Sequence, residues 1–389
     1  MIDTIALMLE ASEFEILEPE KFSPCASCIM HPPYPKLGKG YIFKCVQNPS
    51  RQDIKEGVYK PRLTLIQRPC NVTRQRVINL KIELSAPKFM KGNNFDELDD
   101  TDFTLFCSLL SMRLNYMGIR TTKEMIEKAT VSIIHYSKNF ILEDHLLTRH
   151  VLDGLNKVDS FPRLDTTEKD YRNNGHLIKW HANSYEICLY DKVKDLRQAR
   201  VSQKRAFEKD QYCQTSNLDD LIDSNAQVLR LEIRFNKVKL KQILKELGIK
   251  PVLTLKHLFS ERISKQILTH FWHKITGQDD LLTLIQTNLN DPIEYLENIQ
   301  YAYPALKPKD LMSIMGTSLT IQKIGIAGLK ACFQPDQQRT VKRLIEQAKL
   351  YQPKGNPRWI ATQQIEEKLL RFGKVNLENC IRNTANERS

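Results

Sequence analysis

Short apolar segments with the character of β-strands occupy the first 86 residues of the chain. They are Met1 to Leu9, Gly40 to Val46, Leu63 to Gln67 and Ile78 to Leu84. In the last of these, every second residue is apolar and alternates with Lys81 and Glu83, the period of a half-buried strand. The pattern therefore predicts several strands of a sheet at the start of the chain.

A helix is predicted after the acidic stretch Asp96 to Asp102. Its apolar residues fall three or four positions apart, and they are Phe103, Phe106, Leu110, Leu114 and Met117. Gly118 follows where a helix usually ends. Beyond it the pattern predicts a strand over Ala129 to Tyr136, which contains His135, a helix over Leu142 to Leu155 and a loop over Asp159 to Gly175.

Two further predicted strands carry polar side chains on one face. Tyr185 to Asp191 places Ile187 and Leu189 on one face and Tyr190 on the other. Val228 to Phe235 repeats this alternation, with its apolar residues inward and its polar residues outward. Those outward residues are Arg230, Glu232 and Arg234.

From Leu240 to Phe372 the pattern is almost wholly helical. We therefore predict an α+β protein, with an antiparallel-sheet domain over residues 1–245 and a helical domain over residues 246–389. Three short helices are expected at Pro308 to Met315, Leu319 to Phe333 and Gln337 to Tyr351. They could form a helix-turn-helix that presents Arg339, Lys342 and Arg343, or belong to a plain helical bundle.

The net charge of the chain indicates a class of binding partner. The 389 residues include 58 Lys and Arg against 46 Asp and Glu, a net charge of +12 that favours polyanions, most often nucleic acid. No secretory signal and no apolar run of membrane-spanning length are visible, so we expect a cytoplasmic protein without a membrane partner. The nine cysteines fit reduced thiols; Cys25 and Cys28, with Cys45 and Cys70, could bind zinc or be incidental.

Two common phosphate-binding motifs are absent from the sequence. It has neither a Gly-x-x-x-x-Gly-Lys-Ser/Thr loop nor a Gly-x-Gly-x-x-Gly turn after a strand, which argues against a P-loop ATPase and a dinucleotide enzyme. Tyr190 offers another chemistry, because a tyrosine can attack phosphorus when a nearby cation or metal stabilises its phenolate. Lys192 and Lys194 would supply that charge if the strand continued through them.

A metal would need oxygen or imidazole ligands, which the polar strands offer in His135 and Glu232, with Glu83 as a further candidate. Structural roles remain the alternative, because a single strand histidine is often only hydrogen-bonded. The Arg-x-Glu-x-Arg strand could likewise form a cross-strand ladder of ion pairs.

Five segments, in order, resemble one protein family. They are Met1 to Ile5, Ser85 to Leu98 (which begins Ser-Ala-Pro-Lys and contains Gly-Asn-Asn), Ile134 to Phe140, Leu189 to Val193 and Leu229 to Phe235. Together they are similar to the replication proteins of the gene II/X type, which initiate rolling-circle replication of filamentous phages and plasmids. The resemblance covers most of residues 1–245.

The resemblance implies an endonuclease that nicks and rejoins one strand of supercoiled, double-stranded origin DNA through a 5′-phosphotyrosine. It implies Tyr190 as the nucleophile and a divalent metal, Mg²⁺ or Mn²⁺, with His135 and Glu232 as ligands and Lys192 assisting. A host helicase and a host DNA polymerase are the further partners. The residues expected to bind DNA are basic: Lys194, Arg197, Arg200, Lys204, Arg205, Arg230 and Arg234.

Two other functions stay open on the sequence. A regulator could keep the fold and the basic field, bind DNA and cut nothing. RNA binding has less support, because no stacking-aromatic motif of the known RNA-binding modules is present. If Tyr190 is not the nucleophile, Tyr185 is the next candidate.

Overall fold

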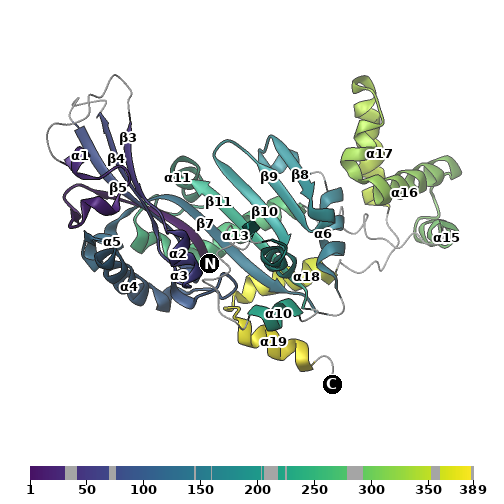
Figure 1. Ribbon diagram of the computed structural model, residues 1–389. Coiled ribbons are helices and arrows are strands. Elements are labelled where there is room, and N and C mark those ends of the chain that lie inside the picture. Colours follow the sequence, from purple (N-terminus) through teal and green to yellow (C-terminus); the bar gives the residue numbers. More distant parts are fainter. Residues whose placement is uncertain are drawn as a thin grey trace.

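A nine-stranded antiparallel sheet forms the centre of the computed structural model (Figure 1). The structure describes residues 1–30, 42–69, 76–143, 146–158, 160–202, 204–205, 218–223, 226–277, 292–351 and 360–386. The strands are β1 (Ile2–Glu10), β3 (Phe43–Gln47), β4 (Arg62–Pro69), β5 (Arg76–Ser85), β7 (Thr130–Ile141), β8 (Glu168–Arg172), β9 (Leu177–His181), β10 (Tyr185–Asp191) and β11 (Val228–Asn236). Their order is β3-β4-β5-β1-β7-β11-β10-β9-β8, and β2 (Glu15–Ile16) pairs separately with β6 (Ile119–Arg120).

Helices surround this sheet and continue beyond it. They are α1 (Ser27–Met30), α2 (Arg51–Lys55), α3 (Ala86–Lys91), α4 (Phe103–Tyr116), α5 (Lys123–Lys128), α6 (Thr148–Lys157), α7 (Phe161–Leu164), α8 (Lys192–Arg197), α10 (Leu218–Asp223), α11 (Lys237–Glu246), α12 (Leu255–Leu258), α13 (Glu261–Thr276), α15 (Pro292–Ala302), α16 (Pro308–Ala331), α17 (Gln338–Leu350), α18 (Ile360–Arg371) and α19 (Leu377–Asn386). The mixture confirms the expected α+β class, and α4 ends before Gly118 as predicted.

The two faces of the central strands differ in chemistry. Ile187, Leu231 and Ile233 are fully buried on one face, which α11 and α13 cover. On the same side, the buried hydroxyl of Tyr136 donates a hydrogen bond to the backbone oxygen of Leu258. The opposite face carries polar side chains, so the alternation of the strands separates a packed side from a chemically functional side.

One expected loop contains structure that its sequence pattern does not reveal. Within residues 159–175 lie α7 and the edge strand β8, so the prediction of a loop there was wrong. Among the described residues, strand β8 pairs only with β9, and apart from Tyr171 its residues, Glu168 to Arg172, are charged. An edge strand of this kind buries little, and therefore shows no apolar alternation.

The helices predicted at 308–315 and 319–333 form a single bent helix, α16. Its bend lies at Gly325, which has a φ of +77° and leaves the helical conformation. A Cβ added there would come within 2.8 Å of the backbone oxygen of Lys157, so α6 approaches α16 where only glycine fits. The following helix, α17, presents Arg339, Lys342 and Arg343 to solvent, and the helix-turn-helix stays a prediction.

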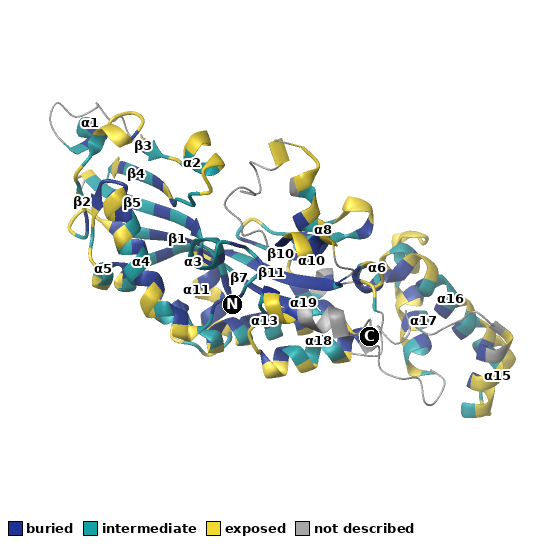
Figure 2. Ribbon diagram, turned by 60° about the horizontal axis from the view of Figure 1, so that its bottom comes forward, coloured by how far each residue is buried: buried dark blue, intermediate teal, exposed yellow. Residues whose placement is uncertain are grey.

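The apolar core extends beyond the strands. Phe271 of α13, Leu369 of α18 and Phe372 belong to the same buried cluster as the central sheet. A second cluster joins α8, α10 and α19 around Leu221 and Leu377. The core thus crosses residue 245, and the domain boundary expected there stays a prediction. Figure 2 shows the buried middle of the sheet and the exposed outer faces of α16 and α17.

Among the described residues, no helix combines the length and the apolar character that crossing a bilayer requires.

Candidate active site

Four neighbouring strands bring the candidate catalytic residues together. The pairing of β7 with β11 sets His135 opposite Arg234, and the pairing of β10 with β11 sets Tyr190 opposite Arg230. Because side chains alternate along each strand, His135, Glu232 and Tyr190 all project from the polar face. The predicted nucleophile and both predicted metal ligands therefore lie on one face of one sheet.

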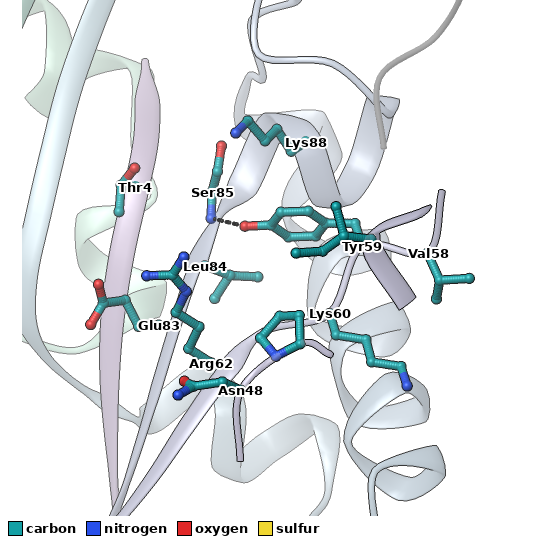
Figure 3. Close-up of a pocket in the computed structure, with 12 residues that line it drawn as sticks. Thr4, Asn48, Val58, Tyr59, Lys60, Arg62, Glu83, Leu84, Ser85 and Lys88 are labelled. Atoms are coloured by element: carbon teal, nitrogen blue, oxygen red, sulfur yellow. Dashed lines mark hydrogen bonds between the residues drawn. The ribbon is translucent and has the colours of Figure 1, made fainter. Parts of the chain in front are cut away.

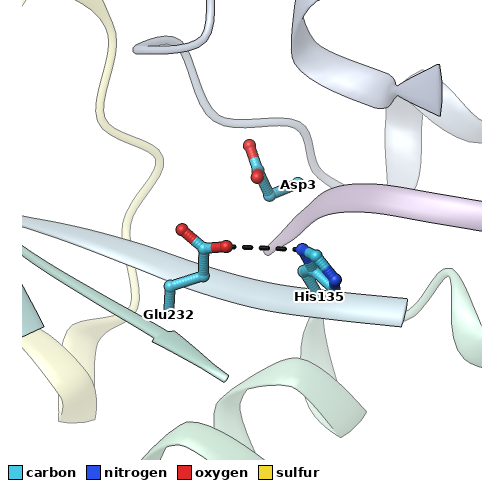
Figure 4. A group of neighbouring side chains, drawn as sticks. All are labelled: Asp3, His135 and Glu232. Carbon is cyan, nitrogen blue, oxygen red and sulfur yellow. Dashed lines mark ion pairs between the residues drawn. The ribbon is translucent and has the colours of Figure 1, made fainter. Parts of the chain in front are cut away.

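A third ligand candidate, Asp3 of β1, completes a cluster with His135 and Glu232. One ligand atom from each residue lies within 4.8 Å of the others. His135 Nδ1 is 3.3 Å from Glu232 Oε1, and Figure 4 shows these two side chains turned toward each other with Asp3 beside them. Two carboxylates and an imidazole fit a divalent cation such as Mg²⁺ or Mn²⁺. Asp3 was not among the predicted ligands, although the resembling segment Met1 to Ile5 contains it.

Glu232 is the most constrained member of this cluster. Burial by itself would raise its pKa, but the charge of Arg234, a hydrogen bond from His135 and the charge of Arg230 outweigh that effect. The pKa of Glu232 consequently lies well below its usual value, and the side chain stays ionised. The second carboxylate oxygen, Oε2, accepts a hydrogen bond from the hydroxyl of Tyr190 at 3.0 Å.

Tyr190 holds its proton tightly in this arrangement. Burial and the negative charge of Glu232 raise its pKa well above the ordinary value, and Arg230 opposes them only in part. The phenol is therefore neutral unless a further positive charge enters the site. A cation bound by Glu232 would supply that charge beside the hydroxyl.

An open cavity of about 630 Å³ gives access to the cluster. Asp3, His135, Tyr190 and Glu232 all line it, together with the exposed Lys194. Tyr190 and its polar neighbours therefore border space that a ligand can enter.

Comparison with protein families identifies the chain. Residues 63–258, half of its length, match the family Phage_CRI, described as the N-terminal part of a replication-associated protein. The protein belongs to this family. Membership confirms the resemblance to gene II-type replication initiators. The matched span includes His135, Tyr190 and Glu232 but not Asp3. No curated protein and no solved structure matches the chain.

In this member of the Phage_CRI family, the segment Leu189 to Val193 does not continue as a strand. β10 ends at Asp191 and α8 begins at Lys192, so the expected period-two placement of Lys192 and Lys194 was wrong. Asp191 Oδ1 caps the helix by accepting the backbone N–H of Lys194 at 2.9 Å. Its other oxygen accepts from the hydroxyl of Thr148 at 2.8 Å, which fixes the turn.

Lys192 nevertheless lies beside the cluster. It is almost fully buried, and desolvation with the nearby charge of Arg230 lowers its pKa to about 7, against the attraction of Asp195, Asp3 and Glu232. An amine in this state can exchange a proton near neutral pH. Lys194 is exposed, and its side chain has no partner among the residues the structure describes.

Arg230 and Arg234 lie on the predicted polar face of β11, but Arg230 is buried there and Arg234 is held in ion pairs. Arg230 is only 2% exposed, and its guanidinium donates to Asp3 Oδ1 at 2.8 Å and to the backbone oxygen of Asn94 at 2.9 Å. It is buried because β11 lies inside the sheet and the Asn94 segment covers its polar face. Arg234 is partly exposed, and bonds Glu186 of β10 and Glu232 at 2.7 Å each. That cross-strand pair matches the structural alternative for this strand.

The remaining basic residues of the predicted DNA-binding set lie outside the cavity lining. Arg197 donates to the backbone oxygen of Ile222, and Arg200 pairs with Asp219 and Asp223, so both tie α8 and the turn after it to α10. Lys204 and Arg205 are exposed. Their role in binding DNA stays a prediction, and residues 203 and 206–217 of the basic segment lie outside the described residues.

The Gly-Asn-Asn part of the family resemblance is a structural junction. The side-chain oxygen of Asn93 accepts the backbone N–H groups of Phe95 and Asp96. Glu97 forms a buried ion pair with Lys138 and accepts the backbone N–H of Val375 at 3.0 Å. This segment thereby joins the sheet to the chain after α18.

Two other candidate ligand sets do not join the cluster. Glu83 pairs with Lys81 at 2.6 Å and lies outside the group of Asp3, His135 and Glu232. Cys28 Sγ and Cys45 Sγ are 4.0 Å apart, whereas Cys25 is exposed. Cys70 lies outside the described residues, and zinc binding stays a prediction.

Proposed function

We propose that this protein initiates rolling-circle replication by nicking one strand of supercoiled, double-stranded origin DNA through Tyr190 and later rejoining it. The observation that carries the proposal is the 3.0 Å contact between the hydroxyl of Tyr190 and Glu232 Oε2, beside Asp3 and His135 in an open cavity. Nucleophile, acidic groups and imidazole thus share one accessible place.

In the nicking step, the oxygen of Tyr190 forms a bond to the scissile phosphorus, and the bond from phosphorus to O3′ breaks. Asp3, His135 and Glu232 would hold Mg²⁺ or Mn²⁺, which when bound stabilises negative charge on a nonbridging phosphate oxygen and on the phenolate. Arg234 and Arg230 keep Glu232 ionised, and therefore ready to coordinate a cation.

The phenol proton has to leave Tyr190, and the departing O3′ has to gain one. Lys192, whose pKa is about 7, can accept a proton in its neutral form and release it from its charged form. We assign it the transfer of this proton from the phenol to O3′, so that no net proton is consumed.

The products explain how the strand is rejoined. The 5′-phosphotyrosine preserves the phosphodiester, and attack by a new 3′-hydroxyl restores the DNA and frees Tyr190 without ATP. The 3′-hydroxyl released in the first step primes a host polymerase while a host helicase separates the strands, so the reaction belongs in the cytoplasm. The absent P-loop fits this scheme.

The test compares nicking by variants of two tyrosines of β10. The substrate is supercoiled DNA of the replicon that carries the gene, and Mn²⁺ is present. Tyr190→Phe should lose nicking and the covalent protein–DNA adduct by at least about 10⁴-fold. Tyr185→Phe is the matched control, because Tyr185 lies on the opposite face against Phe271 and its hydroxyl donates to the backbone oxygen of Asp165. It should nick like the wild type.

Two other results would contradict the proposal. Nicking by Tyr190→Phe would overturn the assignment of the nucleophile. If the wild type shifts the DNA in a gel but gives neither relaxed circles nor an adduct, the protein is the non-catalytic regulator.

A further inference from the structure

We propose that a second cavity, beside the candidate active site, binds unpaired nucleotides next to the scissile phosphate; the inference rests on the proposed function. This cavity has a volume of about 470 Å³ and lies over β4, β5 and the start of α3 (Figure 3). Its lining includes Tyr59, Arg62, Ser85 and Lys88.

The two cavities are contiguous. Thr4, Arg62 and Lys88 line both of them, and Thr4 directly follows the candidate ligand Asp3. A strand whose phosphate reaches Tyr190 can therefore continue past Thr4 into the second cavity without leaving the protein surface.

Charge along this path suits a phosphate backbone. Arg62 is exposed, and its guanidinium makes no hydrogen bond or ion pair with any residue that the structure describes. Glu83, the acidic residue of the lining, is neutralised by Lys81 at 2.6 Å. The cavity therefore presents the guanidinium of Arg62, which lies across from Glu83 in the pairing of β4 with β5, to a ligand.

The wall of the cavity also offers an aromatic ring. The hydroxyl of Tyr59 accepts the backbone N–H of Ser85 at 2.7 Å, which fixes the ring at the cavity, as Figure 3 shows. A ring held in this way can stack on a base, and only an unpaired base exposes its face.

Ser85 has an unused polar group. It stands before α3, where a serine hydroxyl usually accepts a backbone N–H, but no such bond forms, and Pro87 has no N–H to give. The hydroxyl is without a partner among the described residues. Arg62 and Tyr59 thus provide two contacts typical of a single-strand site, a cation and a stacking ring, and the buried Ser85 hydroxyl is a hydrogen-bonding group in the cavity wall.

The experiment measures binding of single-stranded oligothymidine by fluorescence anisotropy, which does not depend on nicking. Arg62→Ala should weaken binding about tenfold and reduce the slope of log affinity against log salt by about one. Lys55→Ala, which removes an exposed charge from α2 outside the lining, should bind like the wild type. Equal affinities of Arg62→Ala and the wild type would overturn the inference.

A second pair of variants tests the ring. Tyr59→Leu should weaken binding about tenfold, whereas Tyr59→Phe keeps the ring and should stay within about threefold of the wild type. Photocrosslinking with an iodouracil-substituted strand should label the peptide that contains Tyr59, and labelling elsewhere only would refute the site. Strand binding with these properties but without any Tyr190 adduct would reject the proposed function and leave this cavity as a binding site.

Discussion

Two segments that resemble the replication-protein family lie near the same cavity and use their polar groups in opposite ways. Between Asn93 and Glu97, side-chain oxygens accept backbone N–H groups, and the one buried charge is paired with Lys138. Around Tyr190, polar groups border open space, and the pKa values of Tyr190 and of the buried Lys192 beside it are shifted. Similarity to a family therefore does not distinguish catalytic residues from structural ones, whereas the hydrogen-bond partners of the residues do.

The largest effect should come from a substitution in the segment Asn93 to Glu97. Glu97→Ala would leave the buried Lys138 without its acidic partner and remove the acceptor of the backbone N–H groups of Asn139 and Val375. We expect a loss of about 3–5 kcal/mol in the free energy of unfolding, measured in urea by circular dichroism. Glu20→Ala, at an exposed position, should change it by less than about 0.5 kcal/mol. Equal stabilities would show that Glu97 is not structural.

A substitution in the cluster of Asp3, His135 and Glu232 should instead lower the affinity for a metal ion. His135→Ala should weaken Mn²⁺ binding by about 100-fold in calorimetry, because one of three ligands is lost. His181→Ala is the matched control, since His181 pairs with Asp170 and Glu186 outside the cluster. The metal site is refuted if both variants bind Mn²⁺ like the wild type.

Lys192 should link stability to pH. Its pKa falls from 10.5 to about 7 on folding, so between these values the unfolded chain binds more protons and stability rises with pH. Compared with Lys192→Met, the wild type should gain about 1–2.5 kcal/mol in the free energy of unfolding from pH 8 to pH 10. Parallel stability curves for the two proteins would contradict the shift.

The smallest expected effect distinguishes the roles of two basic residues near α8, Lys194 and Arg200. Lys194→Ala removes an unpartnered charge from the cavity, so the salt slope of single-strand binding should fall by about one. Arg200→Ala removes a charge already paired with Asp219 and Asp223, and the slope should stay constant. A larger change for Arg200→Ala would reverse the roles assigned to these residues.

Much of the sheet could be predicted because alternation is a local property. Ile187 and Leu189, or Leu231 and Ile233, reveal a buried face within a few residues of sequence. Strand β8 could not be found in this way, since an edge strand with little burial leaves no apolar pattern.

The site could be predicted only in part, because strand pairing is not local. The polar positions of His135, Tyr190 and Glu232 follow from alternation, whereas the approach of Asp3 depends on the place of β1 beside β7. The turn at Asp191 had a readable signal, since aspartate often caps a helix. Burial of Arg230 had none, because a distant segment at Asn94 covers it.

The bonds from Glu97 to Val375 and from Asp96 to Leu377 also have a consequence for biosynthesis. Their partners are separated by 278 and 281 positions along the chain. The Asn94 segment that holds Arg230 therefore gains this support only after the ribosome has added every strand of the sheet. When Tyr190 has already left the ribosome, residues 375 and 377 have not yet been made, and these two hydrogen bonds cannot form. The segment around Asn94 is therefore stabilised much later in translation than the strands that it covers.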